Sequence, residues 1–110
     1  MGEEAPWVVE RRRWLEDVRL RALECDAGAS LGIGGSEVAA AERDARRLIE
    51  LAPFRESGYR LLMDALARRG NSAEALLVYE QLRTLLRDEL GAVPSPPSQA
   101  LHRRLLQSPG

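Results

Sequence analysis

The chain has 110 residues, of which 45% are hydrophobic and 30% charged, which is typical of one folded domain and excludes a disordered segment. Sixteen basic against 17 acidic residues leave a net charge of −1, which argues against a surface that binds a nucleic-acid backbone by charge alone. A single cysteine excludes an internal disulfide, and no signal peptide or apolar run of roughly 18 residues is present. We therefore expect a cytoplasmic protein that does not enter a membrane.

The first periodic segment covers residues 6–26 and begins with Pro6, a residue favoured in the first turn of a helix. Its apolar residues recur at helical spacing and predict one buried stripe, made of Trp7, Trp14, Val18, Ala22 and Cys25. Residues 1–5 are expected to be a disordered or artificially added N-terminus. Residues 27–36 are rich in glycine and predict a flexible connector.

Two further helices are predicted in the middle of the chain. Ser36 is a favourable N-cap for a helix that ends near Leu51, and Pro53 fits the first turn of the next, which ends at Arg69 before Gly70. The residues predicted to share one apolar face are Val38, Ala41, Ala45, Leu48 and Ala52 for the first of these helices, and Tyr59, Leu62, Met63 and Leu66 for the second.

The last third of the chain predicts a long helix, a break and a short helix. Asn71 or Ser72 caps the long helix, Glu74 occupies the capping-box position, and Gly91 ends it. Its buried face is predicted to hold Ala75, Tyr79, Leu82 and Leu86. Residues 91–98 break the helix, and Ser95 then caps a final helix whose apolar residues are Leu101, Leu105 and Leu106. No segment has the pattern of a strand, so the predicted fold is all-α.

The spacing of small and aromatic residues predicts tetratricopeptide-like (TPR-like) helix pairs of about 34 residues. With Ala75 as the small residue of a second helix, Tyr59, Gly70 and Tyr79 occupy expected positions, and a step back of 34 residues reaches Ala41. Glycines interrupt the helix before Ala41, so we predict one and a half to two repeats plus a capping helix. The fold class is an all-α, TPR-like helical-repeat domain of about five helices over residues 6–107, and the alternative is an unrelated bundle.

Several short motifs together resemble one family. They are PFRE at 53–56, Leu62 with Met63, Gly70, AEAL at 73–76 with Tyr79, DELG at 88–91, Pro94 to Pro96, and ALHRRLL at 100–106. This combination resembles the bacterial transcriptional activator domain, the helical domain of regulators of the Streptomyces antibiotic regulatory protein type. Two departures stand out: Ala52 replaces the aspartate that commonly precedes the proline, and Gly58 within a helix costs about 1 kcal/mol.

The resemblance implies a non-catalytic regulatory domain in a transcriptional activator. It implies protein partners: a winged-helix DNA-binding domain in cis or in trans, RNA polymerase, or a second copy in a homodimer. Nothing before residue 7 could encode a winged helix, so the chain is expected to be either an excised fragment or a regulatory domain that stands alone. Without that domain, we expect no tight binding to DNA.

Some residues permit a functional or a purely structural interpretation. Arg11, Arg12 and Arg13 could contact phosphates, although acidic neighbours make a solvated helix face the preferred interpretation. Trp7 and Trp14 are expected to pack in the core; if exposed, they would mark a protein contact. Arginines at 60, 68 and 83 could line a repeat groove that binds an acidic peptide, and solvated arginines are the preferred alternative.

The sequence predicts no metal-binding, anion-binding or catalytic site. His102 and Cys25 cannot assemble a metal site, and Cys25 is expected to be a small buried residue. The glycines at 32–36 could hold an anion at a helix N-terminus, but they lack the lysine and preceding strand of a phosphate loop. We expect no active site and no cofactor.

The function expected from the sequence is therefore regulation by protein contact. The candidate contact residues are Trp7, Arg11, Trp14, Arg55, Tyr59 and Arg60. The alternatives are a stand-alone TPR-like adaptor that binds a peptide or partner protein in its groove, or an accessory domain of a larger signalling ATPase or cyclase.

Overall fold

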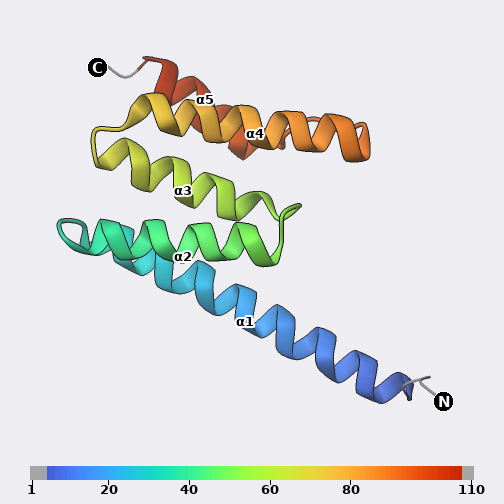
Figure 1. Cartoon of the computed structure of the whole chain (residues 1–110). Coiled ribbons are helices and arrows are strands. Elements are labelled where there is room, and N and C mark those ends of the chain that lie inside the picture. Colours follow the sequence, from blue (N-terminus) through green and yellow to red (C-terminus); the bar gives the residue numbers. More distant parts are fainter. Residues whose placement is uncertain (1–4, 108–110) are drawn as a thin grey trace.

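The computed structural model describes residues 5–107, and within that range it contains five helices and no strand (Figure 1). The helices are α1 (Pro6–Ile33), α2 (Glu37–Leu51), α3 (Glu56–Arg68), α4 (Ser72–Leu90) and α5 (Pro96–Gln107). Each packs against the next in the chain, and the stack measures 58 Å by 34 Å by 19 Å. The all-α, TPR-like fold is confirmed. Of the N-terminus expected to be disordered or artificial, only Ala5 lies within the described residues.

The glycine-rich segment does not form the connector that the sequence predicts. Helix α1 continues through Gly28 and Gly32 to Ile33, because Ala27 and Leu31 are buried against α2 and α3. This packing offsets the roughly 1 kcal/mol that each helical glycine costs. The prediction that the first repeat is interrupted is therefore wrong. The connector is only residues 34–36, where Gly34 and Gly35 have φ angles of +76° and +55° that turn the chain back sharply.

The main core lies between α2 and α5, and the residues predicted for α3 and α4 are buried in it. Its members are Ala45, Tyr59, Leu62, Met63, Leu66, Ala75, Val78, Tyr79, Leu82, Leu86, Leu101 and Leu105. A smaller cluster joins α1, α2 and α3 and consists of Ala27, Leu31, Val38, Ala41 and Ala65. Small residues here let the helix axes approach closely. Of the three leucines named for the final helix, Leu101 and Leu105 are buried and Leu106 is exposed.

Gly58 has a structural reason for its position. A Cβ atom at this residue would lie 3.1 Å from Cγ1 of Ile49 and 3.3 Å from Cγ of Leu48, so the missing side chain lets α2 and α3 approach. Glycine at this position therefore lowers the intrinsic stability of α3, as predicted, but it also allows α2 and α3 to pack closely. The turn before α3 contains Pro53 and Phe54, and α3 begins three residues after Pro53, later than predicted.

The predicted helix caps differ from those observed. Ser36 has helical backbone angles and its side chain forms no capping hydrogen bond, and neither does that of Asn71. The Asn71 amide instead donates to the Glu74 carboxylate at 2.6 Å. The C-terminal ends of the helices agree better with the prediction, because Gly70 follows α3 and Gly91 follows α4.

The apolar stripe of α1 forms as predicted but is not buried. Trp7 is 68% exposed and Trp14 60%, Val18 is also exposed, and so is Cys25, which was expected in the core. With 28 residues α1 is about 42 Å long, whereas α2 with 15 residues is about 22 Å. Helix α2 therefore covers only the second half of α1, and the first half projects from the stack (Figure 1).

Candidate functional site

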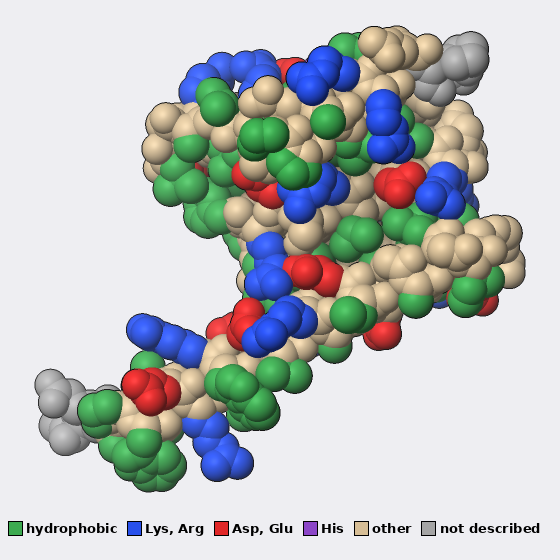
Figure 2. Space-filling view, turned by 180° about the vertical axis from the view of Figure 1, so that it is seen from behind, with side chains coloured by type: hydrophobic (Ala, Val, Ile, Leu, Met, Phe, Trp, Pro, Cys, Tyr) green, Lys and Arg blue, Asp and Glu red, His purple; other side chains and the backbone are tan. Residues whose placement is uncertain are grey.

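The projecting part of α1 is the first candidate surface, and we call residues 6–18 the arm. Hydrophobic and arginine side chains share its surface in the space-filling view (Figure 2). The largest apolar groups on it are Trp7, Trp14 and Leu15, each more than half exposed. Arg11 is exposed between the two tryptophans and forms no ion pair within residues 5–107. Three of the candidate contact residues, Trp7, Arg11 and Trp14, are therefore together on the projecting part of one helix.

The other three candidate residues belong to the body of the fold. Arg55 pairs with Glu24 and lies 3.6 Å from Asp17, measured from Nη1 to Oδ1, so it fastens α1 to the start of α3. The hydrogen bond to Glu24 raises the pKa of Arg55 above its ordinary value. Tyr59 is only 5% exposed, and its hydroxyl donates to the Pro53 carbonyl at 2.7 Å. This buried position leaves Tyr59 no surface for a partner.

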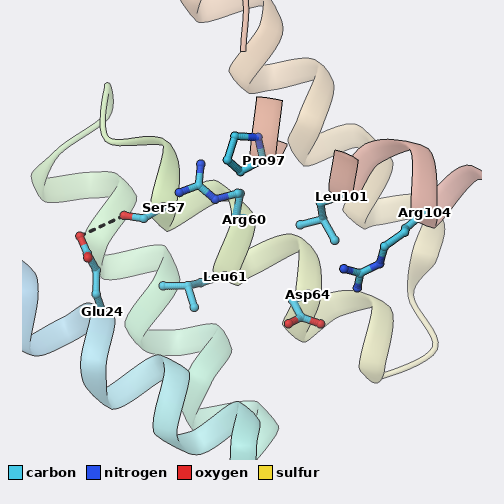
Figure 3. A pocket seen from close by; sticks show the side chains of 8 residues that line it. All are labelled: Glu24, Ser57, Arg60, Leu61, Asp64, Pro97, Leu101 and Arg104. Carbon is cyan, nitrogen blue, oxygen red and sulfur yellow. Dashed lines mark hydrogen bonds between the residues drawn. The ribbon is translucent and has the colours of Figure 1, made fainter. Parts of the chain in front are cut away.

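The sixth residue, Arg60, lines the second candidate surface, a groove of about 390 Å³ between α1, α3 and α5 (Figure 3). The groove is lined by Glu24, Ser57, Arg60, Leu61, Asp64, Pro97, Leu101 and Arg104. Of the three arginines considered for a groove, at positions 60, 68 and 83, Arg60 lines this one and the other two do not. Arg68 donates to the Leu31 carbonyl at 2.9 Å, and Arg83 pairs with Glu80 on α4.

Arg104 is a groove residue that the sequence interpretation missed. It extends from α5 toward the groove, on the same side of the cavity as Asp64 (Figure 3). The sequence contained a signal for it, because residues 97, 101 and 104 have the spacing of one helix face and so place Arg104 beside Leu101. What the sequence did not reveal is that α5 returns to lie against α3.

Glu56 explains why two of the family motifs occur together. Its Oε1 atom accepts hydrogen bonds from the Ser95 amide at 2.9 Å, the Ser95 hydroxyl at 2.9 Å and the Ser98 hydroxyl at 2.8 Å. The Arg60 Nη1 donates to the Ser98 hydroxyl at 3.0 Å, and Ser98 is completely buried. Burial raises the pKa of Glu56, but hydrogen bonds from Ser95 and Ser98 and the charge of Arg60 outweigh it, so this pKa lies below its ordinary value.

His102 stacks on Tyr79, with ring centroids 3.9 Å apart and planes 6° from parallel. The stacking joins α5 to α4 and gives this histidine a structural role. Among residues 5–107, no group of three or more His, Cys, Asp or Glu side chains could hold a metal ion. No helix in the same part of the chain is long and apolar enough to cross a membrane.

Five stacked helices with matched small residues, Ala41 and Ala75, define a TPR-like helical-repeat domain. The chain matches the family described as "Bacterial transcriptional activator domain" over residues 1–106, and it belongs to that family. It is thus a regulatory domain of the transcriptional-activator type. The resemblance seen in the motifs is confirmed.

Two relatives carry the name "Regulatory protein AfsR". The one from Streptomyces coelicolor is 41% identical over 107 residues, which cover 97% of this chain and 11% of the relative. The one from Streptomyces griseus is 39% identical over 103 residues, which cover 94% and 10%. The chain therefore spans about a tenth of the length of these curated relatives. No solved structure matches it.

Proposed function

We propose that this domain is non-catalytic and regulates transcription through a protein contact made by its arm. The observation that carries the proposal is the exposure of Trp7 and Trp14 on the part of α1 that projects from the stack. Large exposed aromatic groups close to arginine are typical of the residues that dominate binding energy at protein interfaces.

The partner that we propose is the DNA-binding domain of the same regulator. Helical-repeat stacks need a polar outer face at each end, and α1 instead presents an apolar stripe at one end of this stack. Its relatives have about ten times as much chain as this segment, which supports a neighbouring domain as the element that covers the stripe. Ion pairs among residues 17, 24 and 55 connect the base of the arm to the start of α3, so a contact on the arm is linked directly to the stack.

Charge favours a protein as the partner of the arm. The arm carries Arg11, Arg12 and Arg13 against Glu10, Glu16 and Asp17, so three positive charges minus three negative charges give zero. A phosphate backbone would gain little from such a surface. The DNA contact in the regulator would then be made by the partner domain, and the arm would fix how that domain is oriented.

The two tryptophans make the test direct, since they are the only ones in the chain and both lie in the arm. Their fluorescence is measured while a winged-helix DNA-binding domain, the proposed partner, is added. We expect a blue shift of the emission maximum and protection from iodide quenching. Trp14→Ala should weaken binding by about tenfold or more, as for a central interface tryptophan.

Leu77→Ala is the matched control, because Leu77 is similarly exposed but lies on α4. If Trp14→Ala and Leu77→Ala bind equally well, the arm is not the interface. Protection of the tryptophans from iodide that depends only on the concentration of this chain would contradict the proposed partner and indicate a homodimer. Protection of the tryptophans by RNA polymerase alone, or by a domain of a larger ATPase or cyclase, would likewise show that the partner is not the DNA-binding domain.

A further inference from the structure

We propose a second binding site, independent of the arm. The groove between α1, α3 and α5 binds an acidic peptide segment in which an apolar side chain lies next to carboxylates. The groove has the volume of a ligand site, about 390 Å³, and its lining combines charged groups with the apolar side chains of Leu61, Pro97 and Leu101 (Figure 3). Three helices that are distant in sequence contribute to it, so it exists only in the folded stack.

The free charge in the groove is positive. Its two carboxylates are already engaged within the fold: Glu24 accepts from Arg55 and from the Ser57 hydroxyl, and Asp64 accepts from Arg68 at 3.0 Å. Arg60 donates to the Ser98 hydroxyl and forms no ion pair within residues 5–107, and its charge also lowers the pKa of Glu56 behind Ser98. Arg104 has no hydrogen bond or ion pair with any residue from 5 to 107. Two guanidinium groups from different helices therefore face the groove without a bound carboxylate.

The chemistry of these groups selects the ligand. A guanidinium group donates two parallel hydrogen bonds to a carboxylate, which gives both strength and orientation. Leu61, Leu101 and Pro97 provide apolar surface beside the arginines, so an apolar side chain adjacent to the carboxylate is favoured. A nucleic acid fits less well, because two guanidinium groups neutralise only a small part of a continuous row of phosphates.

The probe is a fluorescein-labelled peptide with one leucine between two glutamates, titrated with the whole chain and followed by fluorescence anisotropy. We expect saturable binding that weakens as salt is added, because the contacts are ionic and accessible to solvent. The same peptide with glutamines in place of glutamates should bind at least tenfold more weakly. A single charge-assisted contact corresponds to about a tenfold change in affinity.

Arg104→Gln should reduce the affinity by about tenfold without disturbing the fold, because Arg104 has no partner to lose within residues 5–107. Arg60→Gln should reduce it similarly. Arg83→Gln is the control, since it makes the same charge change on α4 outside the groove. Equal affinity in Arg104→Gln and Arg83→Gln, equal binding of the glutamine peptide, or no binding up to millimolar peptide would overturn the proposal. The anisotropy of the labelled peptide does not depend on the tryptophans, so the proposals for the arm and for the groove are tested independently.

Discussion

Replacing Glu56 with alanine tests how the end of the stack is held together. The change removes one carboxylate that accepts three hydrogen bonds, two from Ser95 and one from Ser98, across the gap between α3 and the start of α5. Hydrogen bonds to a charged group contribute about 1.5–3 kcal/mol each, but three that share one oxygen do not add fully. We expect a loss of about 3 kcal/mol in the free energy of unfolding.

Glu56→Gln should cost less, about 1 kcal/mol, because the amide oxygen still accepts hydrogen bonds but carries no charge. Thermal unfolding followed by circular dichroism measures both, and for a domain of this size 3 kcal/mol lowers Tm by roughly 15 °C. Glu50→Ala is the control, since Glu50 is exposed and pairs only with Arg47 at 3.2 Å. A Tm for Glu56→Ala equal to that of Glu50→Ala would refute the reasoning.

The pH dependence gives a second check on Glu56. Its pKa is lowered in the folded state, so its charge stabilises the fold above the unfolded pKa of about 4.3, and this contribution is lost as the pH falls through the folded pKa. The stability difference between the parent and Glu56→Gln should therefore be largest near pH 6 and shrink toward pH 3. A difference that stays constant over this range would show that the charge is not its source.

The remaining predictions concern packing and are read from chemical or thermal unfolding. Tyr79→Ala should cost about 3 kcal/mol because the ring is buried between helices, and an unchanged stability would contradict its position in the core. Gly28→Ala should stabilise by up to about 1 kcal/mol, because a Cβ atom there meets nothing within 4 Å. Gly58→Ala should destabilise by about 1 kcal/mol, because the new atom presses on Ile49 and on the completely buried Leu48. Equal effects of the two glycine substitutions would show that α2 moves aside.

Local sequence signals predicted the helices and the core of α3 and α4 well. The side chains of Leu62, Met63 and Leu82 recur with the helical period, and burial follows directly from that period. The same signal misled in α1, because periodicity shows that a stripe exists and does not show whether another element covers it. Gly28 and Gly32 led to the wrong prediction of a flexible connector. Their low helix propensity is outweighed by the burial of Ala27 and Leu31 on the same helix.

The candidate sites depend on contacts between distant residues, which periodicity cannot provide. Glu56 and Ser95 are 39 positions apart, and only the folded stack brings them together. Arg104 enters the groove because α5 lies back against α3, and Arg68 leaves it because the Leu31 carbonyl is within its reach. Trp7, Arg11 and Trp14 lie on one helix, which local spacing alone could predict, and their part in a protein contact stays a prediction.

The two clusters of buried residues make the stack unequal along its length. The cluster that holds α1 is built largely of alanine, whereas the core of α3 and α4 contains leucine, methionine and tyrosine. Less apolar surface is removed from water at the α1 end, so local opening there costs less free energy than opening of the centre. Hydrogen exchange should accordingly be fastest in α1 and slowest in α3 and α4. A partner that binds the arm therefore engages the end of the stack with less buried apolar surface, and the contact itself would make that end more rigid.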